Sequence, residues 1–122
     1  MIFATIASFV SYMILEATWL HFAKPFYKSM IKYTSLSIKS WTAAVLVYII
    51  MLLSYYYLVI HNREAISILD GVVYGLAVYG VYNLTNKVFI DNYPWSLVIM
   101  DTVWGTFIFA LITLIYKKIH QI

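Results

Sequence analysis

The sequence predicts an all-α integral membrane protein, built as a bundle of four transmembrane helices. The chain of 122 residues is 64% hydrophobic and only 11% charged, whereas soluble domains are about half apolar and about a quarter charged. Four apolar segments reach the length of about 20 residues that a helix needs to cross a bilayer. Many of the 12 tyrosines lie near span ends, which is typical of the aromatic belts at membrane interfaces. We expect one transmembrane domain over residues 1–122.

Each predicted span has its own signature. The first lacks the basic leader and small-residue cleavage site of a signal peptide, so we expect it to be retained. The second carries no charged residue and is the clearest of the four. The fourth follows a short loop that ends at Pro94, a residue suited to the start of a helix. Two of the three connections are short, so neighbouring spans should be antiparallel. The expected bounds are 2–20, 41–60, 66–84 and 96–116.

The third predicted span is the weakest, because it carries Asp70 in its first turns and runs into a polar stretch. Its glycines still offer small surfaces for helix packing. Gly71 and Gly75 form a G-x-x-x-G pair, which permits close approach of two membrane helices, and Gly80 follows. The alternative is a span that is merely rich in glycine. We predict helix packing at these three positions, and association into a homo-oligomer stays open.

The long connection between the first two spans contains Lys24, Lys28 and Lys32 at intervals of four residues. This spacing predicts a short amphipathic helix at the membrane interface, with its lysines reaching lipid phosphates. The alternative is a solvated loop with scattered lysines, because Pro25 limits the length of a helix here.

The basic residues divide unequally between the two ends of the bundle. Side A, which holds both termini, carries three, and side B carries five. By the positive-inside rule, side B faces the cytoplasm and both termini lie on the non-cytoplasmic side. Because these residues flank apolar spans and form no separate basic patch, we expect a lipid bilayer as partner and no nucleic acid. They are Arg63, Lys117 and Lys118 at side A, and Lys24, Lys28, Lys32, Lys39 and Lys87 at side B.

Two carboxylates inside the apolar spans are the strongest functional signal. Glu16 and Asp101 lie near the side B ends of the first and fourth spans, and each precedes a tryptophan by three residues. An ionisable group in hydrocarbon costs about 2.5–3.5 kcal/mol on insertion scales, so it usually faces the protein interior. Four polar residues of the third span share one helical face at the same depth. The predicted intramembrane pocket contains Glu16, Trp19, Tyr79, Tyr82, Asn83, Asn86, Asp101 and Trp104.

Such a pocket has a functional and a structural interpretation. Two nearby carboxylates in a medium of low dielectric should not both be ionised, so they could relay protons, bind a small cation or hold a lipid headgroup. Alternatively, a protonated acid donates a hydrogen bond that locks the bundle. The sequence has no cysteine and no catalytic motif, and its three histidines are not clustered. We therefore expect no catalytic residue, metal or cofactor.

Motifs in both halves of the chain resemble a known family. The segments 79–86, 93–95 and 98–106 are similar to its Y-D-L-T-N, W-P and D-x-x-W-G-T elements, and 16–20 and 23–27 are similar to its D-x-x-W-L and A-K-x-F-Y elements. The family is DUF2177, a group of small predicted membrane proteins. The resemblance implies a four-span membrane protein without an established activity. Members are mostly bacterial, some near genes of lipid modification, and relatives occur in large DNA viruses.

The chain departs from that pattern at three places. Glu16 and Asn83 stand where the family usually has Asp, and the Pro94–Trp95 order is reversed. The loss of one carboxylate weakens any mechanism that needs three acids. The leading hypothesis is a membrane protein that binds or passes a proton, a small cation or a lipid headgroup at Glu16, Asn83 and Asp101. The alternatives are a structural membrane or virion-envelope protein and an accessory subunit of a lipid-modifying system.

Overall fold

A computed structural model describes residues 2–30, 40–61 and 64–121 of the chain. Four long helices, each long and apolar enough to cross a membrane, account for almost all of the described residues. The predicted all-α bundle with four spans is therefore confirmed. The elements are α1 (Ile2–Met30), α2 (Trp41–Tyr55), the π-helical turn η1 (Tyr56–Ile60), α3 (Ile68–Phe89) and α4 (Trp95–His120).

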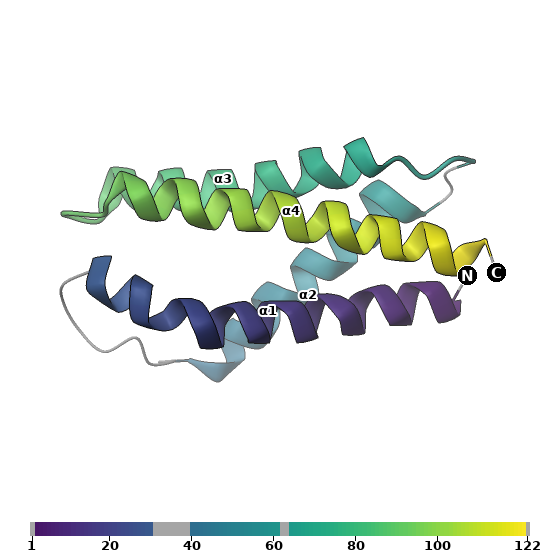
Figure 1. Cartoon of the computed structure of the whole chain (residues 1–122), viewed down its shortest axis with the longest axis horizontal. Coiled ribbons are helices and arrows are strands. Elements are labelled where there is room, and N and C mark those ends of the chain that lie inside the picture. The colour runs from purple at the N-terminus through teal and green to yellow at the C-terminus, as the bar shows by residue number, and fades with distance from the viewer. Residues whose placement is uncertain (1, 31–39, 62–63, 122) are drawn as a thin grey trace.

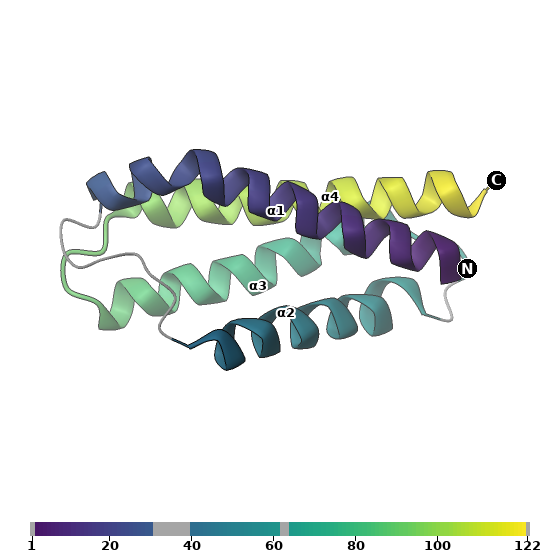
Figure 2. The same ribbon diagram turned by 90° about the horizontal axis from the view of Figure 1, so that it is seen from below.

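The antiparallel pair of α3 and α4 forms the centre of the bundle, and α1 lies along the other side of α4 (Figure 1 and Figure 2). The start of α1 and the end of α4 lie at the same end of the molecule, which is side A. The side chains in the first half of α2 are mostly exposed. Its buried side chains are those of its last turns and of η1, namely Met51, Tyr55, Val59 and Ile60.

Glycine allows the backbones of α3 and α4 to approach closely. A Cβ atom added at Gly75 would collide with the carbonyl oxygen of Gly105 and would lie 2.9 Å from the Cα atom of Thr106. One added at Gly105 would enter the ring of Tyr79. One added at Gly71 would collide with the side chain of Thr113. Small residues at such contacts are typical of packed membrane helices, where close van der Waals contact holds the pair together.

The core of the bundle is aromatic and hydroxylated. Phe109 is fully buried, and the ring centroids of four tyrosines lie 4.9–6.2 Å from its own. Many tyrosines were expected in interfacial belts, but these four are buried between helices. Their rings fill the core, and their hydroxyl groups take hydrogen bonds inside the protein, as a buried polar group requires. The four are Tyr12, Tyr55, Tyr74 and Tyr79.

Three helices are longer than the spans predicted for them, and one of these is α4, which runs from Trp95 to His120 where the sequence predicts 96–116. Helix α1 continues through Pro25 to Met30. The segment that holds Lys24 and Lys28 therefore extends the first helix and is not a separate helix. Lys32 lies outside the described residues. Pro25 removes one backbone hydrogen bond, a loss that transmembrane helices tolerate. The polar stretch after Asn83 is also helical, and α3 ends only at Phe89.

The glycine contacts lead to a stability prediction. We expect Gly75→Ala to lower the free energy of unfolding by about 1–3 kcal/mol, because the added methyl group meets backbone atoms that cannot move aside. Gly80→Ala is the matched control, since the nearest atom to its added Cβ, in Thr102, is 3.8 Å away. Unfolding in mixed micelles, followed by circular dichroism, measures both. Equal stability of the two variants would contradict this packing.

Candidate functional site

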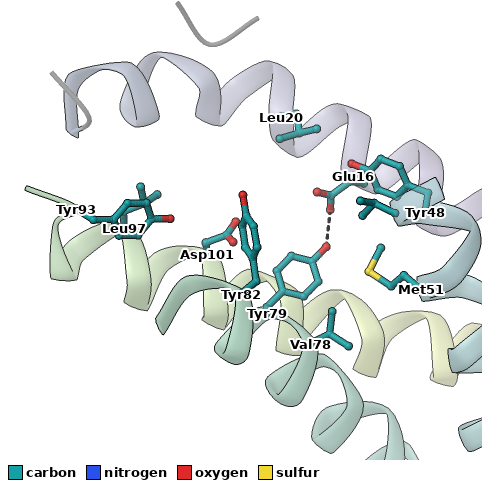
Figure 3. Close-up of a pocket in the computed structure, with 11 residues that line it drawn as sticks. Glu16, Leu20, Tyr48, Met51, Val78, Tyr79, Tyr82, Tyr93, Leu97 and Asp101 are labelled. Atoms are coloured by element: carbon teal, nitrogen blue, oxygen red, sulfur yellow. Dashed lines mark hydrogen bonds between the residues drawn. The ribbon is translucent and has the colours of Figure 1, made fainter. Parts of the chain in front are cut away.

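A cavity of about 430 Å³ lies between the four helices toward side B (Figure 3). All four helices contribute to its wall, together with Tyr93 from the loop before α4. Two carboxylates, four phenol rings and five apolar side chains line it. They are Glu16, Leu20, Val47, Tyr48, Met51, Val78, Tyr79, Tyr82, Tyr93, Leu97 and Asp101.

Glu16 is held at one side of this cavity by hydrogen bonds from two other helices. Its Oε2 atom accepts from the indole Nε1 of Trp104 at 2.9 Å and from the hydroxyl group of Tyr79 at 3.2 Å. The Tyr79 hydroxyl also lies 2.7 Å from that of Tyr12, which in turn donates to the sulfur of Met51 at 3.7 Å. The carboxyl group of Glu16 on α1 is therefore buried, and a continuous chain of polar contacts joins it to α2, α3 and α4.

The two tryptophans that follow the acids in sequence form one structural unit. The rings of Trp19 and Trp104 stack with a centroid distance of 4.5 Å and an interplanar angle of 7°. This stack joins α1 to α4 and fixes the plane of the Trp104 indole, whose N–H points at Glu16. The repeated spacing of acid and tryptophan thus brings one tryptophan beside the acid of the other helix.

Asp101 is held by a second group of polar residues. The side chain of Asn83 is fully buried, and its Nδ2 atom donates to Asp101 Oδ2 at 2.6 Å and to the carbonyl oxygen of Tyr79 at 2.8 Å. Its Oδ1 atom accepts from the Tyr93 hydroxyl at 3.0 Å. Asn86 donates to the same Tyr93 hydroxyl at 3.4 Å. Asn83 therefore uses both its donors and its acceptor and positions the carboxylate.

The loop between α3 and α4 brings Tyr93 to this group. Asn92 adopts a left-handed backbone conformation with φ of 61°, which asparagine tolerates better than most residues. Lys87 donates from Nζ to the carbonyl oxygen of Tyr93 at 2.6 Å and lies over the ring of Trp95, 5.2 Å from its centroid. These contacts close the turn and direct the Tyr93 ring toward the bundle, where it is buried.

The eight residues predicted for the pocket come together in space. Four of them line the cavity, three others form a hydrogen bond to a lining residue, and Trp19 stacks on one of these three, Trp104. Glu16, Tyr79, Tyr82 and Asp101 are the lining residues, and Trp19, Asn83, Asn86 and Trp104 are the supporting ones.

Sequence reasoning missed several residues of the site. Tyr12 lies one turn before Glu16 on the same helical face, so its spacing of four residues was a usable signal. Tyr93 precedes Pro94, and the sequence predicts only a loop at that position. Tyr48 and Met51 of α2 carried no signal, because the second span is uniformly apolar and gives no indication of which face is turned inward.

The arrangement favours a ligand with both polar and apolar parts. No group of three His, Asp or Glu side chains that could hold a metal ion occurs among residues 2–30, 40–61 and 64–121. The cavity combines carboxylates with hydrocarbon and aromatic walls, which is the usual composition of a site for an organic ligand.

The contact between the hydroxyl groups of Tyr12 and Tyr79 can be tested by a double-mutant cycle. We expect Tyr12→Phe and Tyr79→Phe each to lower the free energy of unfolding by about 1 kcal/mol. The double variant should lose less than the sum, with a coupling energy of about 0.5 kcal/mol or more. Tyr12→Phe combined with Tyr55→Phe is the control, because the Tyr55 hydroxyl pairs with Thr113. Additive losses in the first cycle would argue against the contact.

Comparison with known proteins agrees with the resemblance in the motifs. No curated protein and no solved structure matches the chain. The model of one protein family, described as "Predicted membrane protein (DUF2177)", matches residues 1–116. That match includes the first three spans, most of the fourth and every residue of the cavity, and its description agrees with the four apolar helices. The chain therefore belongs to the DUF2177 family of predicted membrane proteins.

Proposed function

We propose that this protein binds the positively charged headgroup of a lipid or similar amphiphile, with Glu16 and Asp101 as the charged contacts. One observation carries the proposal: two carboxylates from different helices line one cavity whose other walls are apolar and aromatic. The site is a binding site in this proposal, and no bond is made or broken in it.

The charges of the lining residues support a cation. Glu16 and Asp101 line the same cavity, and among the residues that the structure describes, those that line it include no lysine, arginine or histidine. Two carboxylates that share a site repel each other when both are ionised. A bound positive charge relieves this repulsion, and its attraction to both groups is strong because the surroundings are poor in water.

The apolar walls support an amphiphile over a hydrated ion. Leu20, Met51, Val78 and Leu97 offer contacts that a hydrated metal ion cannot use, but that an acyl chain or a glycerol backbone can. A volume of about 430 Å³ also falls within the range of about 300–1,000 Å³ that is usual for organic ligands.

The position of α2 supports entry from the bilayer. Val47 lines the cavity and is 58% exposed, and the other side chains in the first half of α2 are mostly exposed. The cavity therefore reaches the outer surface beside α2. In a membrane this surface faces lipid, so a headgroup with its attached chain can enter sideways.

The polar contacts favour binding over proton transfer along a chain of hydroxyls. From Glu16 the polar contacts pass to Tyr79 and Tyr12 and end at the sulfur of Met51. A thioether is a weak acceptor and carries no proton to pass on. This chain ends inside the bundle and supports a site that holds its ligand.

The proposal predicts a lipid preference that depends on the acids. Native mass spectrometry of the protein in maltoside micelles compares dioleoyl phosphatidylcholine, phosphatidylethanolamine and phosphatidylglycerol, of which only the first two carry a cationic nitrogen. We expect the native chain to prefer at least one of these two over phosphatidylglycerol. Asp101→Asn should weaken the binding of the preferred lipid about tenfold, which corresponds to about 1.4 kcal/mol.

Two further variants make the result decisive. Glu16→Gln should act in the same direction as Asp101→Asn, whereas Asp91→Asn should have no effect, because that carboxylate is exposed in the loop before α4. Equal binding of all three lipids by the native chain would refute the proposal. A loss of stability without any change in lipid preference would leave the acids with a structural role.

The proposed orientation places side B in the cytoplasm and both termini outside, as the five-to-three division of basic residues indicates. The chain has no cysteine, so a single introduced cysteine can show which side of the membrane its position faces. We expect a membrane-impermeant maleimide to label Gln121→Cys in intact cells and to label Asp91→Cys only after permeabilisation. The reverse pattern would invert the orientation.

A further inference from the structure

We infer that the headgroup taken by this cavity is a quaternary ammonium of the choline type, held by tyrosine rings and the two carboxylates. The inference deepens the proposed function and rests on it. Its basis is the combination of four aromatic rings in the wall with carboxylates whose hydrogen bonding is already partly used.

Tyrosine is the most frequent residue in the wall of the cavity. Four of the eleven lining residues are tyrosines, and they come from α2, α3 and the loop before α4. Figure 3 shows Tyr79 and Tyr82 rising from α3 into the space between the helices, with Tyr48 on the far side near Glu16. The face of a phenol ring attracts a cation, and cages of aromatic rings are the usual sites for methylated ammonium groups.

Part of the hydrogen-bond acceptor capacity of the two carboxylates is already used within the protein. Glu16 Oε2 already accepts from Tyr79 and Trp104, and Asp101 Oδ2 accepts from Asn83 at 2.6 Å. The Tyr79 hydroxyl is also paired with another tyrosine. A primary ammonium brings three N–H donors into the cavity, and each one that lacks an acceptor costs free energy. A trimethylammonium group brings none.

The remaining wall suits the methyl groups of such a headgroup. Leu20 and Leu97 line the cavity together with the carboxylates, so methyl groups can contact hydrocarbon while the charge lies near Glu16 and Asp101. A trimethylammonium group is also less strongly hydrated than a primary ammonium, which lowers the cost of its transfer into an apolar cavity. Charge, rings and hydrocarbon therefore all favour the methylated cation.

Phosphatidylcholine and phosphatidylethanolamine with identical dioleoyl chains test the inference, because their headgroups differ only in three methyl groups. In titrations followed by native mass spectrometry, we expect the native chain to bind phosphatidylcholine about tenfold more tightly, a factor consistent with cation–π contacts in a desolvated site. Tyr82→Leu should remove most of this preference, and Tyr82→Phe should retain it. Tyr82 is 59% exposed, so neither change opens the core.

The matched control is Tyr57→Leu, which removes another exposed tyrosine outside the cavity and should leave the preference unchanged. Equal or tighter binding of phosphatidylethanolamine would overturn the inference while the proposed function stands. An unchanged preference in Tyr82→Leu would overturn the role of the rings. If neither lipid binds more tightly than phosphatidylglycerol, the proposed function itself is overturned.

The same ligand chemistry could come from a lipid or from a free solute, and a competition experiment separates the two. Choline chloride at millimolar concentration is added to the complex with phosphatidylcholine. Displacement would show that the quaternary ammonium suffices and that a small solute can be the source. Retention of the lipid, together with the expected preference, would assign the ligand to the bilayer. Both results support recognition of a quaternary ammonium.

Discussion

The close approach of α3 and α4 is the contact on which the rest of the structure depends. Because Gly105 has no side chain, the ring of Tyr79 can lie directly on the backbone of α4. This position lets the Tyr79 hydroxyl reach Glu16 on α1, and it lets Asn83, one turn further along α3, reach Asp101 on α4. A single contact between helices thus positions both halves of the polar site.

Burial of polar groups then determines how the other helices pack. In hydrocarbon a hydroxyl, an amide or a carboxyl group needs a partner within the protein, and several of the partners found here come from another helix. Glu16 joins α1 to α3 and α4, and the Tyr74 hydroxyl joins α3 to the Met51 carbonyl oxygen of α2. Because lipid tails are as apolar as leucine, such bonds and close packing supply the specificity that a hydrophobic core supplies in water.

The sequence allowed the fold to be predicted almost completely, because span length and hydropathy depend on composition alone. It also indicated which side chains of the predicted pocket would share a layer, because Glu16 and Asp101 are conspicuous in apolar spans. It could not indicate how far the helices continue. Pro25 and the polar run after Asn83 looked like ends, yet backbone hydrogen bonding continues past both. Nor could it reveal the contribution of Tyr48, because the inward face of α2 depends on packing that leaves no periodic pattern.

The length of α1 has a consequence for how the membrane acts on this protein. Its 29 residues extend about 44 Å at about 1.5 Å per residue, well beyond a hydrocarbon core of about 30 Å. A helix that exceeds its bilayer must tilt or project into the headgroup layer, and the balance shifts with bilayer thickness. Glu16 lies in the middle of this helix, where hydrogen bonds from α3 and α4 hold it. A change in bilayer thickness therefore acts mainly on the projecting ends of α1 and least on the polar site.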